Sequence, residues 1–283
     1  MKKILLTAGL ALVVLSVSFP SAVRRVYGQV DESAAATGAD FIAPAVFQAA
    51  GPSGASIQGI VTQYQAALGG KNNNNDPAHG DGFRLINWDG GNPAVVATTI
   101  SPNPFAGFQT TRGALFATPD GTGFVQAPPS GLAAENVFNN PSYATIFTPF
   151  SASRLFSAIG SNVTDVTFFV PGGGNVAATT RGFGAVFADV DQPDGSGPGE
   201  KRGNRKASTL VEYFGVNGEL LFSSLVPASP GDGSLSFFGV VFSDARIARV
   251  RITSGNAVPG ADDSGKVDVV MMDDFIYAEP KAQ

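Results

Sequence analysis

Short apolar runs alternate with turn-forming segments along most of the chain beyond Phe83. Each run has the length of a β-strand, and Gly, Pro, Asn or Asp separates it from the next. This alternation predicts an all-β fold, either a sandwich or a barrel. The predicted strands are residues 84–88, 113–118, 163–170, 182–191, 209–214, 220–226, 235–242, 247–253 and 267–277.

Period-two patterning predicts antiparallel sheets. In residues 248–253 the apolar residues Ala248, Val250 and Ile252 share one face of a strand, while two arginines and a threonine share the other. One face of that strand is therefore exposed to solvent, as is common in antiparallel sheets.

The clearest hairpin joins residues 209–214 to residues 220–226 through Asn217-Gly218. This pair accepts positive φ at both central positions of a type I′ turn, the turn that suits the twist of two paired strands. We therefore expect an antiparallel jelly roll or β-sandwich.

Only one segment has substantial helical spacing. Between residues 55 and 68 apolar residues recur every three or four positions, and Gly69 and Gly70 end the pattern. The asparagine run that follows, residues 72–75, has no apolar surface to bury and favours a flexible connector. The chain thus divides into three parts. Residues 1–28 form the N-terminal segment, residues 29–79 form an Ala/Gly-rich arm with a short helix and an Asn-rich hinge, and residues 80–283 form a β-sandwich domain.

The N-terminus has the pattern of a secretory signal peptide. Lys2 and Lys3 precede an apolar run, and small residues follow it, so cleavage is expected after Ala22 or Gly28. The run is shorter than the roughly 20 residues that span a bilayer, which disfavours the alternative of a membrane anchor. We expect a protein that is secreted, either extracellular or periplasmic, with no membrane span after signal removal.

Charge and cysteine content narrow the possible partners. Cleavage after Gly28 removes four basic residues and no acid, which lowers the net charge from −5 to −9. Such a surface should repel nucleic acid and anionic membranes. The absence of cysteine excludes disulfides, thiolate chemistry and cysteine-ligated metals.

A first acidic set follows the predicted strand 182–191. Asp189, Asp191 and Asp194 converge at one strand end, where either a cation or arginines must neutralise their mutual repulsion, and hard carboxylate oxygens suit Ca²⁺. The spacing resembles a calcium loop without the closing Glu of an EF-hand. The alternative is a solvated acidic turn whose negative charge is neutralised by nearby basic side chains. Those bases are Lys201, Arg202, Arg205 and Lys206.

A second acidic set lies near the C-terminus. Asp262 and Asp263 occupy a Gly-rich loop, and Asp273 and Asp274 interrupt the apolar strand 267–277. Strict alternation places Asp273 with Phe275 on one face and Asp274 on the other. A carboxyl among apolar neighbours must be paired, hydrogen-bonded or bound to metal. Either a metal or the backbone N–H groups of a strand entrance or bulge would satisfy it.

Catalytic signatures are scarce. The single histidine, His79, lies in the hinge-like stretch, and neither a nucleophile elbow nor a zinc-protease or phosphate-loop motif occurs. The remaining carboxylates permit glycoside hydrolysis without favouring it. Trp88, the only tryptophan, could stack on a sugar or fill the core.

Four segments together resemble the jelly-roll modules of secreted bacterial proteins, many of them of the PEP-CTERM type. They are GFGAVFADVD at 182–191, FFGVVF at 237–242, IARVRI at 247–252 and MDDFIY at 272–277. The chain lacks the C-terminal sorting tail of that type. The resemblance implies a galactose-binding-like sandwich, some members of which carry structural calcium near the first and last strands, and it implies no activity.

Three functions follow from these patterns. The first is a secreted non-catalytic module that binds glycan or extracellular matrix, with a calcium ion held by some of Asp189, Asp191, Asp273 and Asp274 and with Trp88 at the ligand. The second is a structural protein of the cell envelope or matrix. The third is a carbohydrate-active hydrolase or lyase.

Overall fold

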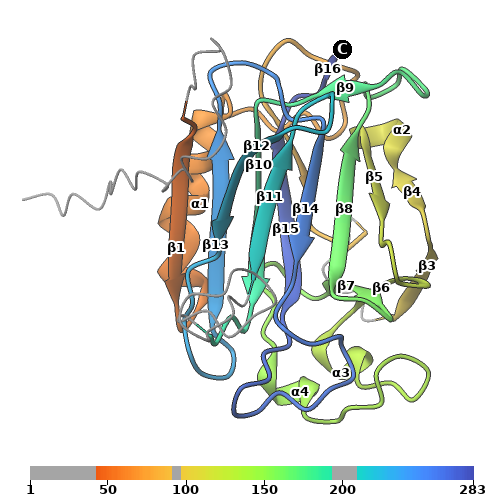
Figure 1. Cartoon of the computed structure of the whole chain (residues 1–283), viewed down its shortest axis with the longest axis vertical. Helices are drawn as coiled ribbons and strands as arrows, with labels where there is room; N and C mark the ends of the chain where they lie inside the picture. The colour runs from red at the N-terminus through yellow and green to blue at the C-terminus, as the bar shows by residue number, and fades with distance from the viewer. Residues whose placement is uncertain (1–42, 91–96, 193–208) are drawn as a thin grey trace, which may run out of the picture.

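The computed structural model describes residues 43–90, 97–192 and 209–283. Two antiparallel sheets face each other as a sandwich, with strands running along the long axis of the molecule (Figure 1). The eight-stranded sheet has the order β1-β13-β10-β15-β7-β6-β3, and β2 also pairs with β15. Its strands are β1 (Ala45–Gly51), β2 (Phe83–Ile86), β3 (Thr99–Pro102), β6 (Gly123–Ala127), β7 (Leu155–Ile159), β10 (Gly182–Ala188), β13 (Leu235–Val241) and β15 (Met271–Ala278).

The six-stranded sheet has the order β12-β11-β14-β8-β5-β4. Its strands are β4 (Phe105–Phe108), β5 (Ala114–Ala117), β8 (Val163–Phe168), β11 (Leu210–Phe214), β12 (Leu220–Leu225) and β14 (Arg249–Thr253). A small ribbon pairs β9 (Ala178–Thr179) with β16 (Lys281–Ala282). The helices are α1 (Gly54–Ala67), α2 (Gln109–Arg112), α3 (Pro129–Leu132) and α4 (Tyr143–Ile146).

Within the described residues, the predicted antiparallel sandwich with one substantial helix is confirmed, and each of the nine predicted strands overlaps an observed one. In β14, Val250 and Ile252 are fully buried while Arg249 and Arg251 remain partly exposed, as the alternation predicts. The pattern did not reveal β1, whose sequence AVFQAAG has few large apolar residues. Because β1 pairs with β13 on one side, it lies at the edge of the sheet.

Two layers of apolar side chains stabilise the sandwich. The inter-sheet core lies between the sheets and includes Phe183, Phe187, Phe275, Val250 and Phe116. The outer core lies between the far face of the eight-stranded sheet and the helices. It includes Ile57, Val61, Tyr64, Val186, Phe237 and Ile276. Because the central strands of this sheet are buried on both faces, their sequences are almost continuously apolar.

A pair of glycines lets α1 approach the sheet. Gly184 in β10 and Gly239 in β13 lie opposite each other, and a Cβ added to Gly239 would lie 2.9 Å from the Tyr64 ring and 3.1 Å from the Gly184 Cα. The Tyr64 hydroxyl donates a 3.3 Å hydrogen bond to the Val240 carbonyl. The GFG and FFGV patterns thus provide the surface on which the helix packs.

The predicted hairpin is present, but its turn differs from type I′. Gly218 has φ of 79°, whereas Asn217 is not among the residues with positive φ. The Gly218 N–H donates to the Gly215 carbonyl at 3.1 Å, and the register shifts between Tyr213 and Phe214. This is a type I turn followed by a glycine bulge, the usual solution for a slightly longer hairpin loop.

The Asn-rich segment is a packed loop, and the prediction of a flexible connector is wrong for these residues. Asn73 is fully buried and donates to Glu279 at 2.9 Å, while the side chain of Asn74 both accepts from and donates to the Leu85 backbone at 2.9 Å. Fully buried Arg84 forms an ion pair with Glu279 at 2.7 Å and also donates to carbonyls of this loop. Hydrogen bonding here replaces the missing apolar burial.

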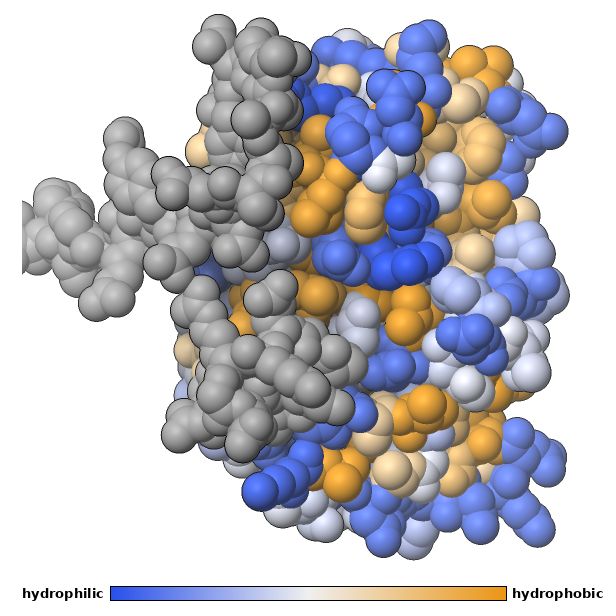
Figure 2. Space-filling model, in the orientation of Figure 1, coloured by the Kyte–Doolittle hydropathy of each residue, from blue (hydrophilic) through white to orange (hydrophobic). Residues whose placement is uncertain are grey.

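Where Figure 2 shows described residues, hydrophilic and hydrophobic patches lie side by side on this face of the sandwich. Within the three described ranges, no helix combines the length and apolar character required to cross a bilayer. The expected signal peptide, residue Asp194 and the basic run of residues 201–206 lie outside the described residues.

Candidate metal centre

Asp189 follows the last residue of β10 and turns the chain. Its φ of 68° lies in the left-handed region, which aspartate tolerates better than most non-glycine residues. Its N–H donates to the Ser234 carbonyl at 3.0 Å, and the next side chain, Val190, enters the inter-sheet core. The backbone at Asp189 is therefore held in place, and the residue is 0% exposed.

Three aspartates converge at this point. Asp189, Asp191 and Asp263 each offer one carboxylate oxygen, and the three oxygens lie within 4.8 Å of one another. Asp191 accepts a 2.7 Å hydrogen bond from the Gly231 N–H, and Asp263 accepts one of 3.3 Å from the Val269 N–H. We call this group the aspartate trio.

Both Asp189 carboxyl oxygens are buried without a hydrogen-bond donor. Burial raises the pKa of Asp189 to about 10, and contact with Asp263 and the charges of Asp191 and Asp268 add to the effect. Burial also raises the pKa of Asp263. Without a cation, the trio must therefore retain a proton at neutral pH, and Asp189 and Asp263 can then share it.

The loop that carries Asp263 is held against α4, at the end of the sandwich far from β9 and β16 (Figure 1). The Tyr143 hydroxyl donates to the Ala261 carbonyl at 2.8 Å and accepts from the Gly260 N–H at 2.7 Å. Beside the trio, buried Asp268 accepts from the Asp191 and Gln192 N–H groups at 3.3 and 3.4 Å. These contacts bring two loops distant in sequence to one site.

The aspartate trio could hold a metal ion. Its donors are carboxylate oxygens, the ligands that hard cations prefer, and a cation would supply the partner that the Asp189 oxygens lack.

Asp273 and Asp274 belong to a different cluster, and the trio takes its third carboxylate from Asp263. The pairing of β15 with β10 shifts between Ala185 and Val186, so that Asp274 is the extra residue of a β-bulge. The bulge reverses the predicted faces beyond it: Met272 and Phe275 both point into the inter-sheet core, contrary to strict alternation.

Backbone donors satisfy Asp273. Its carboxyl accepts from the N–H groups of Phe150, Ser151 and Asp274 at 2.6, 3.1 and 2.8 Å. The bulge alternative raised by the sequence therefore accounts for its burial. Desolvation, followed by the charge of Asp274, raises the pKa of Asp273.

Asp274 shares the Ser151 hydroxyl with two other carboxyls. Ser151 Oγ lies 2.7 Å from Asp274 Oδ1 and 3.2 Å from oxygens of both Asp273 and Asp89. Burial raises the pKa of Asp274 to about 6, and the charge of Asp89 contributes. Hydrogen bonds with Ser151 and Asp273 lower the pKa in part.

Trp88 is a core residue, and the sugar-stacking interpretation fails at this position. It is 1% exposed and its ring stacks on Phe156 with 3.8 Å between centroids and 5° between planes. Phe108, Phe116 and Phe275 also pack against it in T-shaped arrangements, and this burial leaves no ring face open to a ligand.

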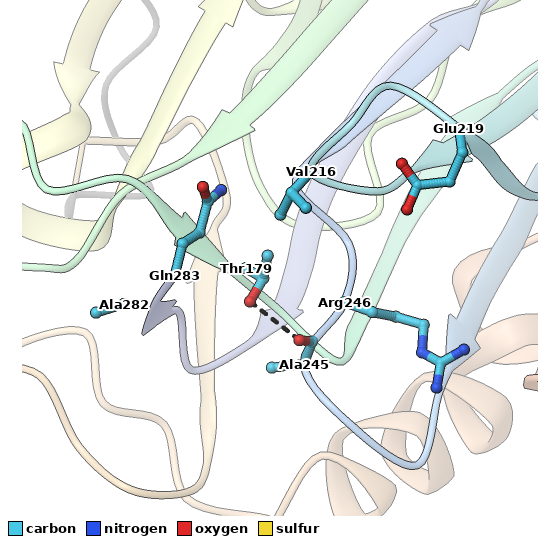
Figure 3. Close-up of a pocket in the computed structure, with 7 residues that line it drawn as sticks. All are labelled: Thr179, Val216, Glu219, Ala245, Arg246, Ala282 and Gln283. Carbon is cyan, nitrogen blue, oxygen red and sulfur yellow. Dashed lines mark hydrogen bonds between the residues drawn. The ribbon is translucent and has the colours of Figure 1, made fainter.

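Two pockets lie elsewhere on the surface. The first, of about 430 Å³, has Glu219 and Arg246 on one side and Ala282 and Gln283 on the other (Figure 3). Its charged groups are used locally, since Arg246 pairs with Asp244 at 2.6 Å and Glu219 accepts from the Asn217 N–H at 3.0 Å. The second, of about 530 Å³, is formed by the Asn-rich loop.

Comparison with protein-family models, with curated proteins and with solved structures finds no match to this chain. The resemblance to PEP-CTERM-type jelly-roll modules remains a prediction. Function must therefore be argued from the sites themselves.

Proposed function

We propose that this chain is a secreted, non-catalytic binding module whose β-sandwich is stabilised by one calcium ion in the aspartate trio. The observation that carries the cation is Asp189, fully buried with both carboxyl oxygens lacking a donor and directed at two further carboxyls. A buried, unpaired carboxyl is costly, and a bound cation removes that cost.

Calcium fits the ligand set better than other common metals. Zinc and copper sites usually include histidine or cysteine, whereas this trio offers only oxygen. Mg²⁺ demands near-octahedral geometry and retains several waters, while Ca²⁺ accepts irregular sets of carboxylates and carbonyls. Export, expected from the N-terminal pattern, would expose the site to a calcium-rich environment.

The pockets support a binding role over hydrolysis. Glycoside hydrolysis generally requires two carboxyls that flank the scissile bond. Each of the two described pockets is lined by a single acidic residue, Glu219 in one and Asp76 in the other. The remaining polar groups are amides, a threonine and arginines, which are suited to recognition.

Thermal unfolding tests the cation directly. The purified chain is treated with a chelator and melted alone, with Ca²⁺ and with Mg²⁺. Calcium should raise the melting temperature more than magnesium, and Asp263→Asn should abolish the rise. The matched control is Asp262→Asn at the neighbouring position, which lies outside the trio and contacts Asn140. An unchanged melt of the wild-type chain on adding calcium would refute the proposal.

A further inference from the structure

The pocket beside the Asn-rich loop is polar and stands at the end of the sandwich opposite the aspartate trio. Its volume of about 530 Å³ lies within the range of small-molecule sites, roughly 300–1,000 Å³. Its lining is Asn72, Asn74, Asn75, Asp76, Leu85, Asn87 and Arg112.

The wall of this pocket is built on buried supports. Asn73 and the Arg84–Glu279 ion pair hold the loop from beneath, and Asn74 clamps it to the Leu85 backbone. On the facing side, the Arg112 guanidinium donates to the Leu85 carbonyl at 2.6 Å and lies 5.1 Å over the Phe108 ring. A ligand would therefore meet groups already fixed in place, which lowers the entropic cost of binding.

Several polar groups in the pocket have unused hydrogen-bonding capacity. Among the described residues, no hydrogen bond engages the side-chain amides of Asn75 and Asn87, and the Asn72 side chain is engaged only as an acceptor, by the Asn74 N–H at 3.0 Å. Each amide offers both donors and acceptors at short range. Vicinal hydroxyl groups, which also donate and accept, match such a surface.

The charge balance favours a neutral ligand. Asp76 and Arg112 are the two charged residues of the lining, so their charges balance, and the ion pair of Asp76 with Lys71 at 2.8 Å weakens its attraction for a cation. We propose that this pocket binds a neutral saccharide, through the amides of Asn72, Asn75 and Asn87 and the guanidinium of Arg112. This inference rests on the proposed binding function and gives it a site and a ligand class.

Saturation-transfer NMR on the purified chain tests the pocket with named probes: the methyl glycosides of galactose, glucose and mannose, N-acetylglucosamine, and their neutral disaccharides. At least one should give transfer to its ring protons. The Asn75→Ala/Asn87→Ala variant should raise the dissociation constant at least tenfold, because both amides line the pocket and form no hydrogen bond with another described residue. Gln58→Ala, an exposed amide on α1, is the matched control and should bind as the wild type does.

Three results would overturn the inference: no transfer from any neutral probe, binding that survives the double variant, or binding only of anionic sugars such as oligogalacturonate. The calcium-dependent melt of each variant shows that it is folded. It also separates the two proposals, because a normal calcium response without saccharide binding rejects the pocket alone, whereas loss of the calcium response in wild type rejects the cation site.

Discussion

Replacing Asp189 with asparagine should stabilise the calcium-free protein and abolish the stabilisation that calcium gives the wild type. In the cation-free protein the pKa of Asp189 is about 10, against 3.8 for an ordinary aspartate. At pH 7 the unfolded chain releases this proton and the folded chain retains it. The group therefore destabilises the fold over about three pH units, at most about 4 kcal/mol at 1.36 kcal/mol per unit.

Asparagine has the shape of the protonated acid, tolerates the left-handed backbone and does not titrate. In chelator at pH 7, Asp189→Asn should therefore be the more stable protein, by about 1–4 kcal/mol. For a domain of this size each kcal/mol shifts the melting temperature by about 2–4 °C. The difference should shrink as the pH falls towards 4, because the unfolded aspartate is then protonated as well.

Calcium should offset this difference, and it should reverse the order of stability where the difference is below about 2.7 kcal/mol. At 100 times the dissociation constant, a ligand that binds only the folded state stabilises it by about 2.7 kcal/mol. The wild type should gain that amount, while the variant, which lacks the buried charge, should gain almost none. Melting curves of both proteins in chelator and in calcium provide the assay, with Asp262→Asn as control. A variant that is less stable than wild type in chelator, or that still responds to calcium, would refute the reasoning.

Three further substitutions test the packing around the sites. Burial raises the pKa of Asp274 to about 6, so its carboxyl opposes folding as the pH rises from about 4 through 6. Asp274→Asn should remove up to about 3 kcal/mol of this loss of stability. Denaturant titrations in which wild type and variant have the same pH profile would contradict this. Glu279→Gln leaves the buried Arg84 charge without its partner and should cost about 3–5 kcal/mol in urea unfolding, whereas a cost below 1 kcal/mol would contradict the tight ion pair. Gly239→Ala places a methyl 2.9 Å from the Tyr64 ring and should cost about 1–3 kcal/mol, and an unchanged midpoint would show that α1 can move away.

Strand periodicity allowed much of the fold to be predicted from the sequence. The alternation in β14 and the turn after Phe214 are local signals, and both strands of the hairpin were found. The edge strand β1 was missed because alanine and glycine carry little pattern, and the turn type was wrong because Gly218 alone takes a positive φ. In the Asn-rich segment, buried hydrogen bonds to Arg84 and Glu279 determine a structure that composition does not reveal.

The candidate metal centre was only half predictable. Asp189 and Asp191 are close in sequence and end an apolar strand, so their convergence could be foreseen. Asp263 comes from a different loop, and its place depends on how that loop packs against Tyr143. The adjacent acids Asp273 and Asp274 within an apolar strand were a signal of a bulge, which regular alternation cannot represent.

Calcium binding by the chelator-treated chain, measured by isothermal titration calorimetry at pH 7.5, is the most direct test of the cation site. The account predicts one ion per chain, with a dissociation constant no weaker than the 10⁻⁴–10⁻³ M typical of extracellular calcium modules. It also predicts loss of the signal in Asp189→Asn and retention in Asp262→Asn. No heat of binding by the wild type up to 10 mM calcium, confirmed by equilibrium dialysis, would contradict the claim that the buried Asp189 carboxyl is a metal ligand.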